Sequence, residues 1–158
     1  MHFITPLLHF VLTGQKPEQL VLQFDVCFGN APFDDLIQNK MQLDFDTNGE
    51  LSKKGKVDFI LPDRILQNDI FHKAPPKSFD RDDFSEMLLP LNNLKIEDAL
   101  ATFAYMHAKV IQINCEMLAK SGGMPKAILV CGGGRKNIAI MDEMRKWLSG
   151  VEIKAIDD

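Results

Sequence analysis

The sequence predicts an α/β fold in which parallel strands are covered by helices. Two observations support this class. Residues 20–26 are rich in branched and aromatic side chains, which is typical of a buried strand. A turn at 27–30 separates them from a helical apolar stripe at Phe33, Leu36 and Ile37, and Pro32 suits the first helical turn. Residues 127–155 have the pattern strand, helix, strand, and such a unit places its two strands parallel and beneath helices.

The last unit is compact and has clear boundaries. We expect a strand at 127–131, a helix at 138–148 and a second strand at 151–155. Three glycines at 132–134 follow the first strand at once, and Asn137 is suited to cap the helix that comes next. The unit therefore presents bare backbone where the first strand ends.

The longest helical pattern covers residues 96–120. Its acidic first turn and the Lys120 side chain in its last turn both suit the helix dipole, and two glycines end it. A shorter helix is expected at 57–66, where Pro62 limits its length.

Size and composition indicate one domain over residues 1–158. The chain has 158 residues, 46% of them hydrophobic and 25% charged, which is ordinary for a globular protein. The net charge of -4 leaves no basic field for a nucleic acid backbone. Residues 1–12 are apolar but too short to span a membrane, and they lack the features of a signal peptide.

The cysteines and the acidic loop predict no metal site. Cys27, Cys115 and Cys131 are an odd number without metal-ligand spacing, which fits a reduced, cytoplasmic protein. The polar stretch 44–55 imitates the first half of an EF-hand, but its twelfth position is Gly55, where calcium requires a glutamate. We expect a solvated turn there.

Two features have chemical potential. Glycines at the carboxyl edge of a parallel sheet let a purine or a phosphate approach the main chain, although a purely structural turn is the alternative. The run 132–137 lacks the third glycine of a dinucleotide fingerprint and the spacing of a P-loop. Asp25, expected at the end of its strand, suits a general base; the alternative is that it caps the following turn.

Together these features resemble a known family. Residues 24–30 (FDVCFGN) resemble the Phe-Asp-Thr-Gly-Pro-Gly-Asn motif of anhydro-N-acetylmuramic acid kinases, and residues 75–78 (PPKS) resemble that family's Pro-Pro-Lys-Ser loop. Residues 97–102 are similar to the start of its long helix, and residues 129–137 (LVCGGGRKN) to its nucleotide motif. The four motifs occur in the family's order.

The resemblance implies a fold and an activity. The fold is the ribonuclease-H-like lobe of actin-like ATPases, with a mixed sheet flanked by helices. The implied reaction uses ATP, Mg²⁺ and water to convert 1,6-anhydro-N-acetylmuramic acid into N-acetylmuramic acid 6-phosphate in peptidoglycan recycling. By motif position Asp25 is the base that activates water. The nucleotide-binding residues are then Gly132, Gly133, Gly134 and Asn137, and the sugar-binding residues are Gly29, Asn30, Lys77 and Ser78.

The chain also departs from the family pattern. Val26, Cys27 and Phe28 stand where the family has Thr, Gly and Pro, and we expect Phe28 to add bulk where the sugar approaches. The resemblance covers only the C-terminal lobe of a two-lobe sugar kinase and is truncated at both ends. We therefore expect little activity from this chain alone, and a homo-oligomer or a separate N-terminal lobe as partner.

Two other readings of function remain open from the sequence. One is a non-catalytic nucleotide-binding or interaction module. The other is a Rossmann-type dinucleotide-binding domain, against which the absent third glycine argues.

Overall fold

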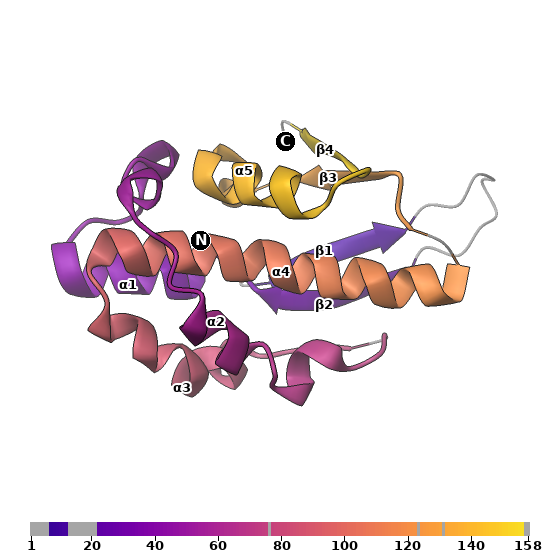
Figure 1. Ribbon diagram of the computed structural model, residues 1–158, viewed down its shortest axis with the longest axis horizontal. Coiled ribbons are helices and arrows are strands. Elements are labelled where there is room, and N and C mark those ends of the chain that lie inside the picture. The colour runs from indigo at the N-terminus through magenta and orange to yellow at the C-terminus, as the bar shows by residue number, and fades with distance from the viewer. Residues whose placement is uncertain (1–6, 13–21, 76, 123, 131, 157–158) are drawn as a thin grey trace, which may run out of the picture.

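The computed structural model describes residues 7–12, 22–75, 77–122, 124–130 and 132–156 (Figure 1). Residues 20 and 21 of the first predicted strand and Cys131 of a later one lie outside these ranges. The strands and main helices are β1 (Leu7–Leu12), β2 (Leu22–Phe28), α1 (Ala31–Met41), α2 (Ile60–Ile65), α3 (Ser85–Leu88), α4 (Ile96–Gly122), β3 (Ala127–Val130), α5 (Ile138–Trp147) and β4 (Glu152–Ala155). Short 3-10 turns connect several of them.

The strands form two separate pairs. β3 and β4 are parallel, with Ala127 opposite Glu152, which confirms the predicted strand–helix–strand unit. β1 and β2 are antiparallel, with Leu12 opposite Leu22. The strand β1 was not predicted, and the described residues form two two-stranded sheets rather than one mixed sheet. At Asp25 the main chain of β2 bonds to the carbonyl of Lys77 instead of to a further strand.

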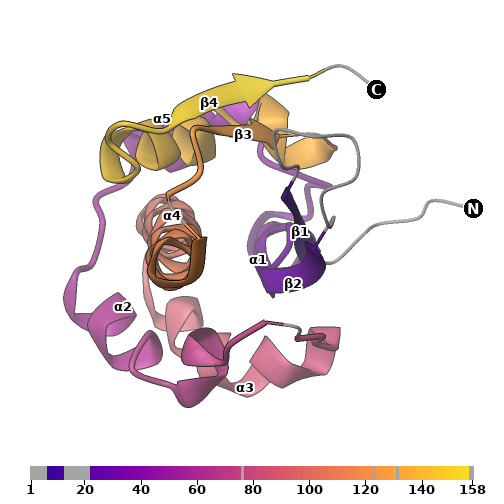
Figure 2. The ribbon, with the colours of Figure 1, turned by 90° about the vertical axis from the view of Figure 1, so that its right-hand side faces the viewer.

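Helix α4 is the centre of the molecule. Seen from one end, α5 with β3 and β4 lies on one side of it, α2 and α3 lie on the opposite side, and α1 with β1 and β2 lies beside it (Figure 2). With 27 residues it is about 40 Å long. Every residue from Ala99 to Ala108 is buried, because other elements cover the helix on nearly all sides. None of the helices in the described ranges is long and apolar enough to cross a membrane.

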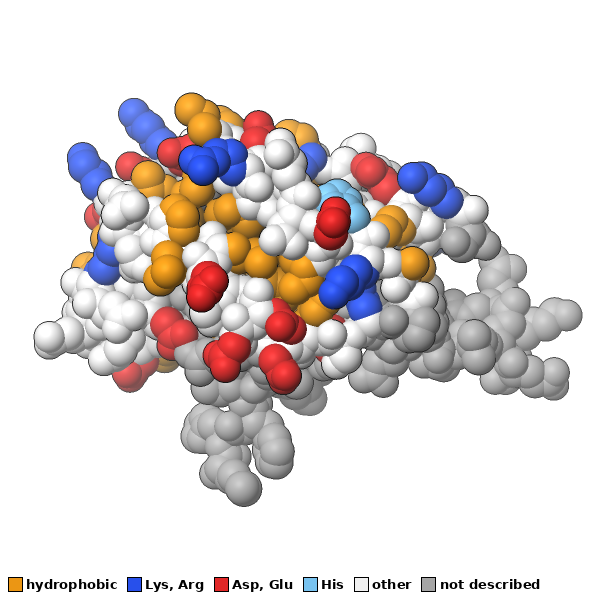
Figure 3. Space-filling model, turned by 90° about the horizontal axis from the view of Figure 1, so that it is seen from below, with side chains coloured by type: hydrophobic (Ala, Val, Ile, Leu, Met, Phe, Trp, Pro, Cys, Tyr) orange, Lys and Arg blue, Asp and Glu red, His pale blue; other side chains and the backbone are white. Residues whose placement is uncertain are grey.

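The face of the molecule formed by α2 and α3 has a shallow apolar hollow. Figure 3 shows hydrophobic side chains across this face among acidic ones. The hollow has a volume of about 250 Å³ and lies between α2 and α3 with the segment that follows α3. Its lining residues are Leu61, Arg64, Ile65, Asn68, Met87 and Pro90.

Phe28 belongs to the core rather than to the site. Its ring is 1% exposed and lies 4.8 Å from the ring of Phe103 and 5.5 Å from that of Phe84. The expectation that Phe28 adds bulk on the sugar side is therefore wrong. The strand β2 extends to Phe28, so this residue belongs to the strand and not to the turn that the sequence predicts, and its ring points into the core.

His107 lies in the same aromatic cluster, with its ring 5.7 Å from that of Phe28. Burial lowers the pKa of His107 from 6.5 to about 4, because the imidazolium would lose its hydration. The unfolded chain therefore binds a proton in a pH range where the folded chain does not.

We predict that the contribution of His107 to the free energy of unfolding falls as the pH decreases from about 6.5 to about 4. Because the folded pKa is the lower one, the stability from neutral His107 is complete above pH 6.5 and is lost toward pH 4. The expected loss is about 3 kcal/mol, measured by urea unfolding at several pH values. Over the same pH range, the free energy of unfolding of the variant His107→Leu should fall by about 3 kcal/mol less than that of the wild type.

The comparison between the two proteins isolates this histidine. Burial, and secondarily Asp35, raises the pKa of Asp34 to about 6, which acts in the opposite direction, but Asp34 is present in both proteins. Parallel stability curves for the wild type and His107→Leu would contradict the prediction.

Candidate functional site

Asp25 is held by the loop that follows the paired prolines. Its carboxylate atom Oδ2 accepts hydrogen bonds from the hydroxyl of Ser78 and from the backbone N–H of Phe79, both at 2.9 Å. The N–H of Asp25 in turn donates to the carbonyl of Lys77 at 3.1 Å. The structure thus brings together two motifs that are more than fifty residues apart in the sequence.

The surroundings of Asp25 differ from the sequence expectation in two ways. Asp25 lies within β2, three residues before its last residue, and not at the end of a strand. Its carboxylate accepts from residues 78 and 79, so a cap on the turn after β2 is not what holds it. The side chain is 6% exposed, and two donors on one oxygen fix its orientation.

Lys77 is half-buried and belongs to the loop that holds the Asp25 carboxylate. Removal from water lowers its pKa to about 8; the Cys27 thiol opposes this shift and Lys73 adds to it. Its ammonium group lies 5.6 Å from the centre of the Phe79 ring. At neutral pH Lys77 is therefore mostly charged, and it suits an anionic or strongly polar ligand group.

The glycine turn has the open backbone that the sequence predicts. Gly132 has φ of +72° and ψ of -169°, a region that only glycine enters readily. A 3-10 turn follows over Gly133–Lys136, and Arg135 donates to the carbonyl of Gly132 at 2.7 Å. Gly133 is exposed, so the turn presents main chain to solvent.

Asn30 joins the two halves of the site. It precedes α1, and its side chain does not cap that helix. A Cβ added to Gly133 or Gly134 would lie 3.4 or 3.3 Å from the side-chain amide of Asn30. Asn30, five residues after Asp25, therefore packs against the glycine turn. Three of the four predicted motifs thus lie together, and the one at the start of α4 lies apart from them.

Asn137 caps α5, as the sequence predicts. Its Oδ1 accepts from the N–H groups of Ala139 and Ile140 at 3.0 and 3.2 Å. This oxygen is thus used within the protein, and contact between Asn137 and a nucleotide stays a prediction.

The stretch 44–55 is more than the solvated turn that the sequence suggests. Asp46, Gly49 and Ser52 are buried, and the Asp46 carboxylate accepts from the N–H of Leu51 at 2.8 Å and from both the N–H and the hydroxyl of Ser52. Gly49 touches Asn137. The spacing of Asp46 and Gly49 was a signal for this local structure, but not for the contact with α5. Within the described ranges no three His, Cys, Asp or Glu side chains are placed to hold a metal ion.

The family comparison agrees with the sequence motifs. A sequence model described as "Anhydro-N-acetylmuramic acid kinase" matches residues 11–158. A relative of that name from Roseobacter denitrificans is 32% identical over 145 residues, which are 90% of this chain and 37% of the relative. Another, from Rhodospirillum rubrum, is 38% identical over 141 residues, which are 89% of this chain and 36% of the relative. The chain thus spans little more than a third of the length of these relatives. The matches favour the kinase resemblance over the Rossmann-type alternative.

We predict that Gly132→Ala lowers stability by about 1–3 kcal/mol through backbone strain alone. A Cβ at Gly132 would meet nothing within 4 Å, so no steric term contributes. Gly133→Ala is the matched control, because its φ is ordinary and its Cβ would lie in normal contact with Asn30. Urea unfolding measures both, and equal effects of the two substitutions would contradict the strain argument.

Proposed function

The chain belongs to the anhydro-N-acetylmuramic acid kinase family, and from this membership we propose that it carries the catalytic base and the nucleotide-binding turn of such a kinase. The proposed reaction converts 1,6-anhydro-N-acetylmuramic acid, ATP and water into N-acetylmuramic acid 6-phosphate and ADP. The observation that supports it is the meeting of Asp25, the loop at 77–79, Asn30 and the glycine turn at one place in the fold.

In the proposed mechanism Asp25 removes a proton from water. The water oxygen bonds to the anomeric carbon, and the bond from that carbon to the bridging oxygen breaks with its electron pair left on the oxygen. That oxygen then attacks the γ-phosphorus, and ADP leaves. A carboxylate suits the first step because water is a poor nucleophile until it loses a proton. The donors from Ser78 and Phe79 hold the base in one orientation.

The nucleotide is proposed to lie against the glycine turn. Gly132, Gly133 and Gly134 would face its adenosine end, with Asn137 behind them at the start of α5. Lys77, Gly29 and Asn30 are proposed to face the sugar, together with the hydroxyl of Ser78. Mg²⁺ would neutralise phosphate charge as it does in phosphoryl transfer generally. No residue of this chain is assigned to Mg²⁺, which binds largely through substrate phosphates and water and needs no cluster of three protein ligands.

The fold and the setting are part of the same proposal. We propose that residues 1–158 form one domain, that it is a lobe of the ribonuclease-H-like type, and that it works in the cytoplasm with a second lobe or a second copy. The mixed α/β architecture around α4 is compatible with such a lobe.

We predict that Asp25→Asn abolishes turnover and leaves Mg·ATP binding unchanged, because the amide cannot take a proton from water. Turnover is measured in the presence of the proposed second lobe, by mass spectrometry of the phosphosugar formed in ¹⁸O-labelled water. The wild-type product should carry ¹⁸O on the anomeric carbon and none in the phosphate. Product incubated without enzyme in labelled water corrects for exchange, and Asp142→Asn, an exposed carboxylate on α5, is the matched control.

Two results would contradict this proposal. One is a product that carries ¹⁸O in its phosphate, since water would then have attacked phosphorus. The other is saturable binding of Mg·ATP with no phosphosugar formed even when the proposed second lobe is supplied, which would support a non-catalytic nucleotide-binding module instead.

We predict that Gly133→Asp weakens Mg·ATP binding by about tenfold or more, because it adds a negative charge where the triphosphate-bearing ligand approaches. Isothermal titration calorimetry measures the affinity. Gly133→Ala, which adds a Cβ without charge, separates the electrostatic effect from the steric one. Unchanged affinity in Gly133→Asp would place the nucleotide elsewhere.

A further inference from the structure

We propose that Gly49 is a positioning residue for the nucleotide-binding turn, and that residues 46–58, which we call the brace, hold that turn in place from α4. This inference rests on the proposed function, because it assigns the nucleotide to the turn at 132–136. It concerns a segment far from the turn in the sequence that packs beside the turn and α5.

The contact between the brace and α5 leaves no room for a side chain. Gly49 is buried and has φ of +73°. A Cβ there would overlap the Oδ1 atom of Asn137 and would lie 3.0 Å from the backbone nitrogen of Ala139. That Oδ1 is the acceptor that caps α5 through Ala139 and Ile140. Only glycine therefore permits the brace and the cap to occupy their present positions.

The brace is rigid within itself. The Asp46 carboxylate binds the N–H groups of Leu51 and Ser52, at 2.8 and 3.0 Å, as well as the Ser52 hydroxyl. These three donors fix the turn that carries Gly49. A buried carboxylate with several donors holds its loop firmly, because exposing either partner alone would cost a hydrogen bond to a charged group.

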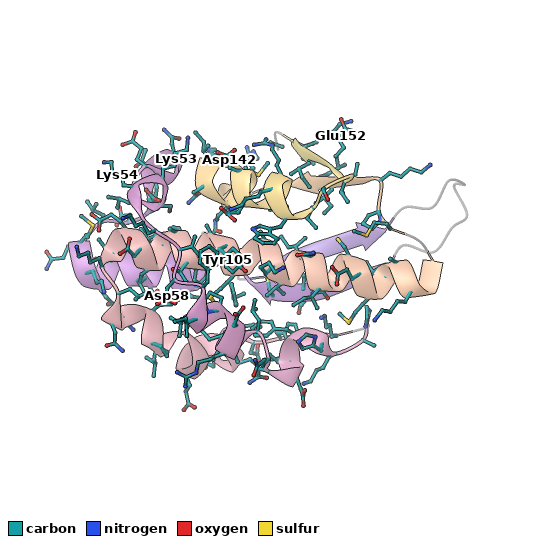
Figure 4. The ribbon with its side chains drawn as sticks, in the orientation of Figure 1. Lys53, Lys54, Asp58, Tyr105, Asp142 and Glu152 are labelled. Carbon is teal, nitrogen blue, oxygen red and sulfur yellow. The ribbon has the colours of Figure 1, made fainter. Side chains whose placement is uncertain are left out.

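The far end of the brace is fixed to α4. A Cβ at Gly55 would overlap the backbone of Glu97, so the two main chains are in direct contact. The N–H of Lys56 donates to Asp98 at 2.7 Å, and the N–H of Asp58 donates to Thr102 at 2.9 Å. In Figure 4, Lys53 and Lys54 mark the part of the brace near α5 and Asp58 marks its end beside α4.

The cap at Asn137 controls the glycine turn because the two are continuous. The N–H of Asn137 donates to the carbonyl of Gly134 at 3.1 Å and closes the turn. A displacement of Asn137 therefore moves Gly134, and with it the contact to Asn30. The brace thus fixes the turn relative to α4. The sugar side of the site contacts the same turn through Asn30.

The test compares Gly49→Ala with Gly150→Ala. Both glycines have a left-handed φ, +73° and +86°, so both substitutions strain the backbone, but a Cβ at Gly150 would meet nothing within 4 Å. We expect Gly49→Ala to bind Mg·ATP about tenfold more weakly than Gly150→Ala, as measured by calorimetry. Binding of the anhydro sugar should weaken less than binding of Mg·ATP, because the turn reaches the sugar side through Asn30, whereas a general loss of structure would weaken both alike.

A second measurement does not depend on nucleotide. Hydrogen exchange of the Ala139 and Ile140 amides should be faster in Gly49→Ala than in Gly150→Ala, while the amides of α4 exchange equally in both. If Gly49→Ala does not fold, Asp46→Asn weakens the brace more gently, and exposed Asp44→Asn is its control.

The outcomes separate this inference from the proposed function. Equal Mg·ATP affinity and equal amide exchange in the two glycine variants would overturn the role of the brace. A wild type that binds no Mg·ATP would overturn the proposed function and the nucleotide role of the brace together, and faster exchange in Gly49→Ala would then show only that the brace supports α5.

Discussion

The burial of α4 on nearly all sides is the constraint on which the rest of the structure depends. A helix covered from Ala99 to Ala108 has no face left to solvent, so each neighbouring element gains its own apolar contacts from it. Strand β2 contributes Phe28, which packs on Phe103. The helix is therefore a common support, and segments attached to it are positioned relative to one another even where they do not touch.

The two halves of the candidate site are connected through this support. Asp25 lies on β2 next to the aromatic cluster, and the loop at 77–79 is bonded to it directly. The glycine turn is reached from the other direction, because residues 46–58 join α4 to the cap of α5. Asn30 connects the two halves, because its side chain packs against the glycine turn. Main-chain groups take part in several of these contacts.

Sequence periodicity was sufficient for α4 and for the strand–helix–strand unit, because their apolar patterns are long and their caps are local. It was not sufficient for β1, since Leu7–Leu12 becomes a strand only by pairing with β2. The bonds from residues 78 and 79 to Asp25 join distant parts of the chain and leave no local pattern. The prediction of a solvated turn around Asp46 failed for another reason. A loop whose buried carboxylate accepts hydrogen bonds from its own backbone has the same polar sequence as a turn exposed to solvent.

The departures from the family motif at residues 26–28 acquire a structural meaning from this comparison. Where the resemblance leads one to expect Thr, Gly and Pro, the chain has three apolar residues that are at most 1% exposed. They extend β2 into the core, so Asp25 is held by a strand on both sides and not by a turn after it. The Asp25 carboxylate is then fixed from the core, and its orientation depends on the loop at 77–79.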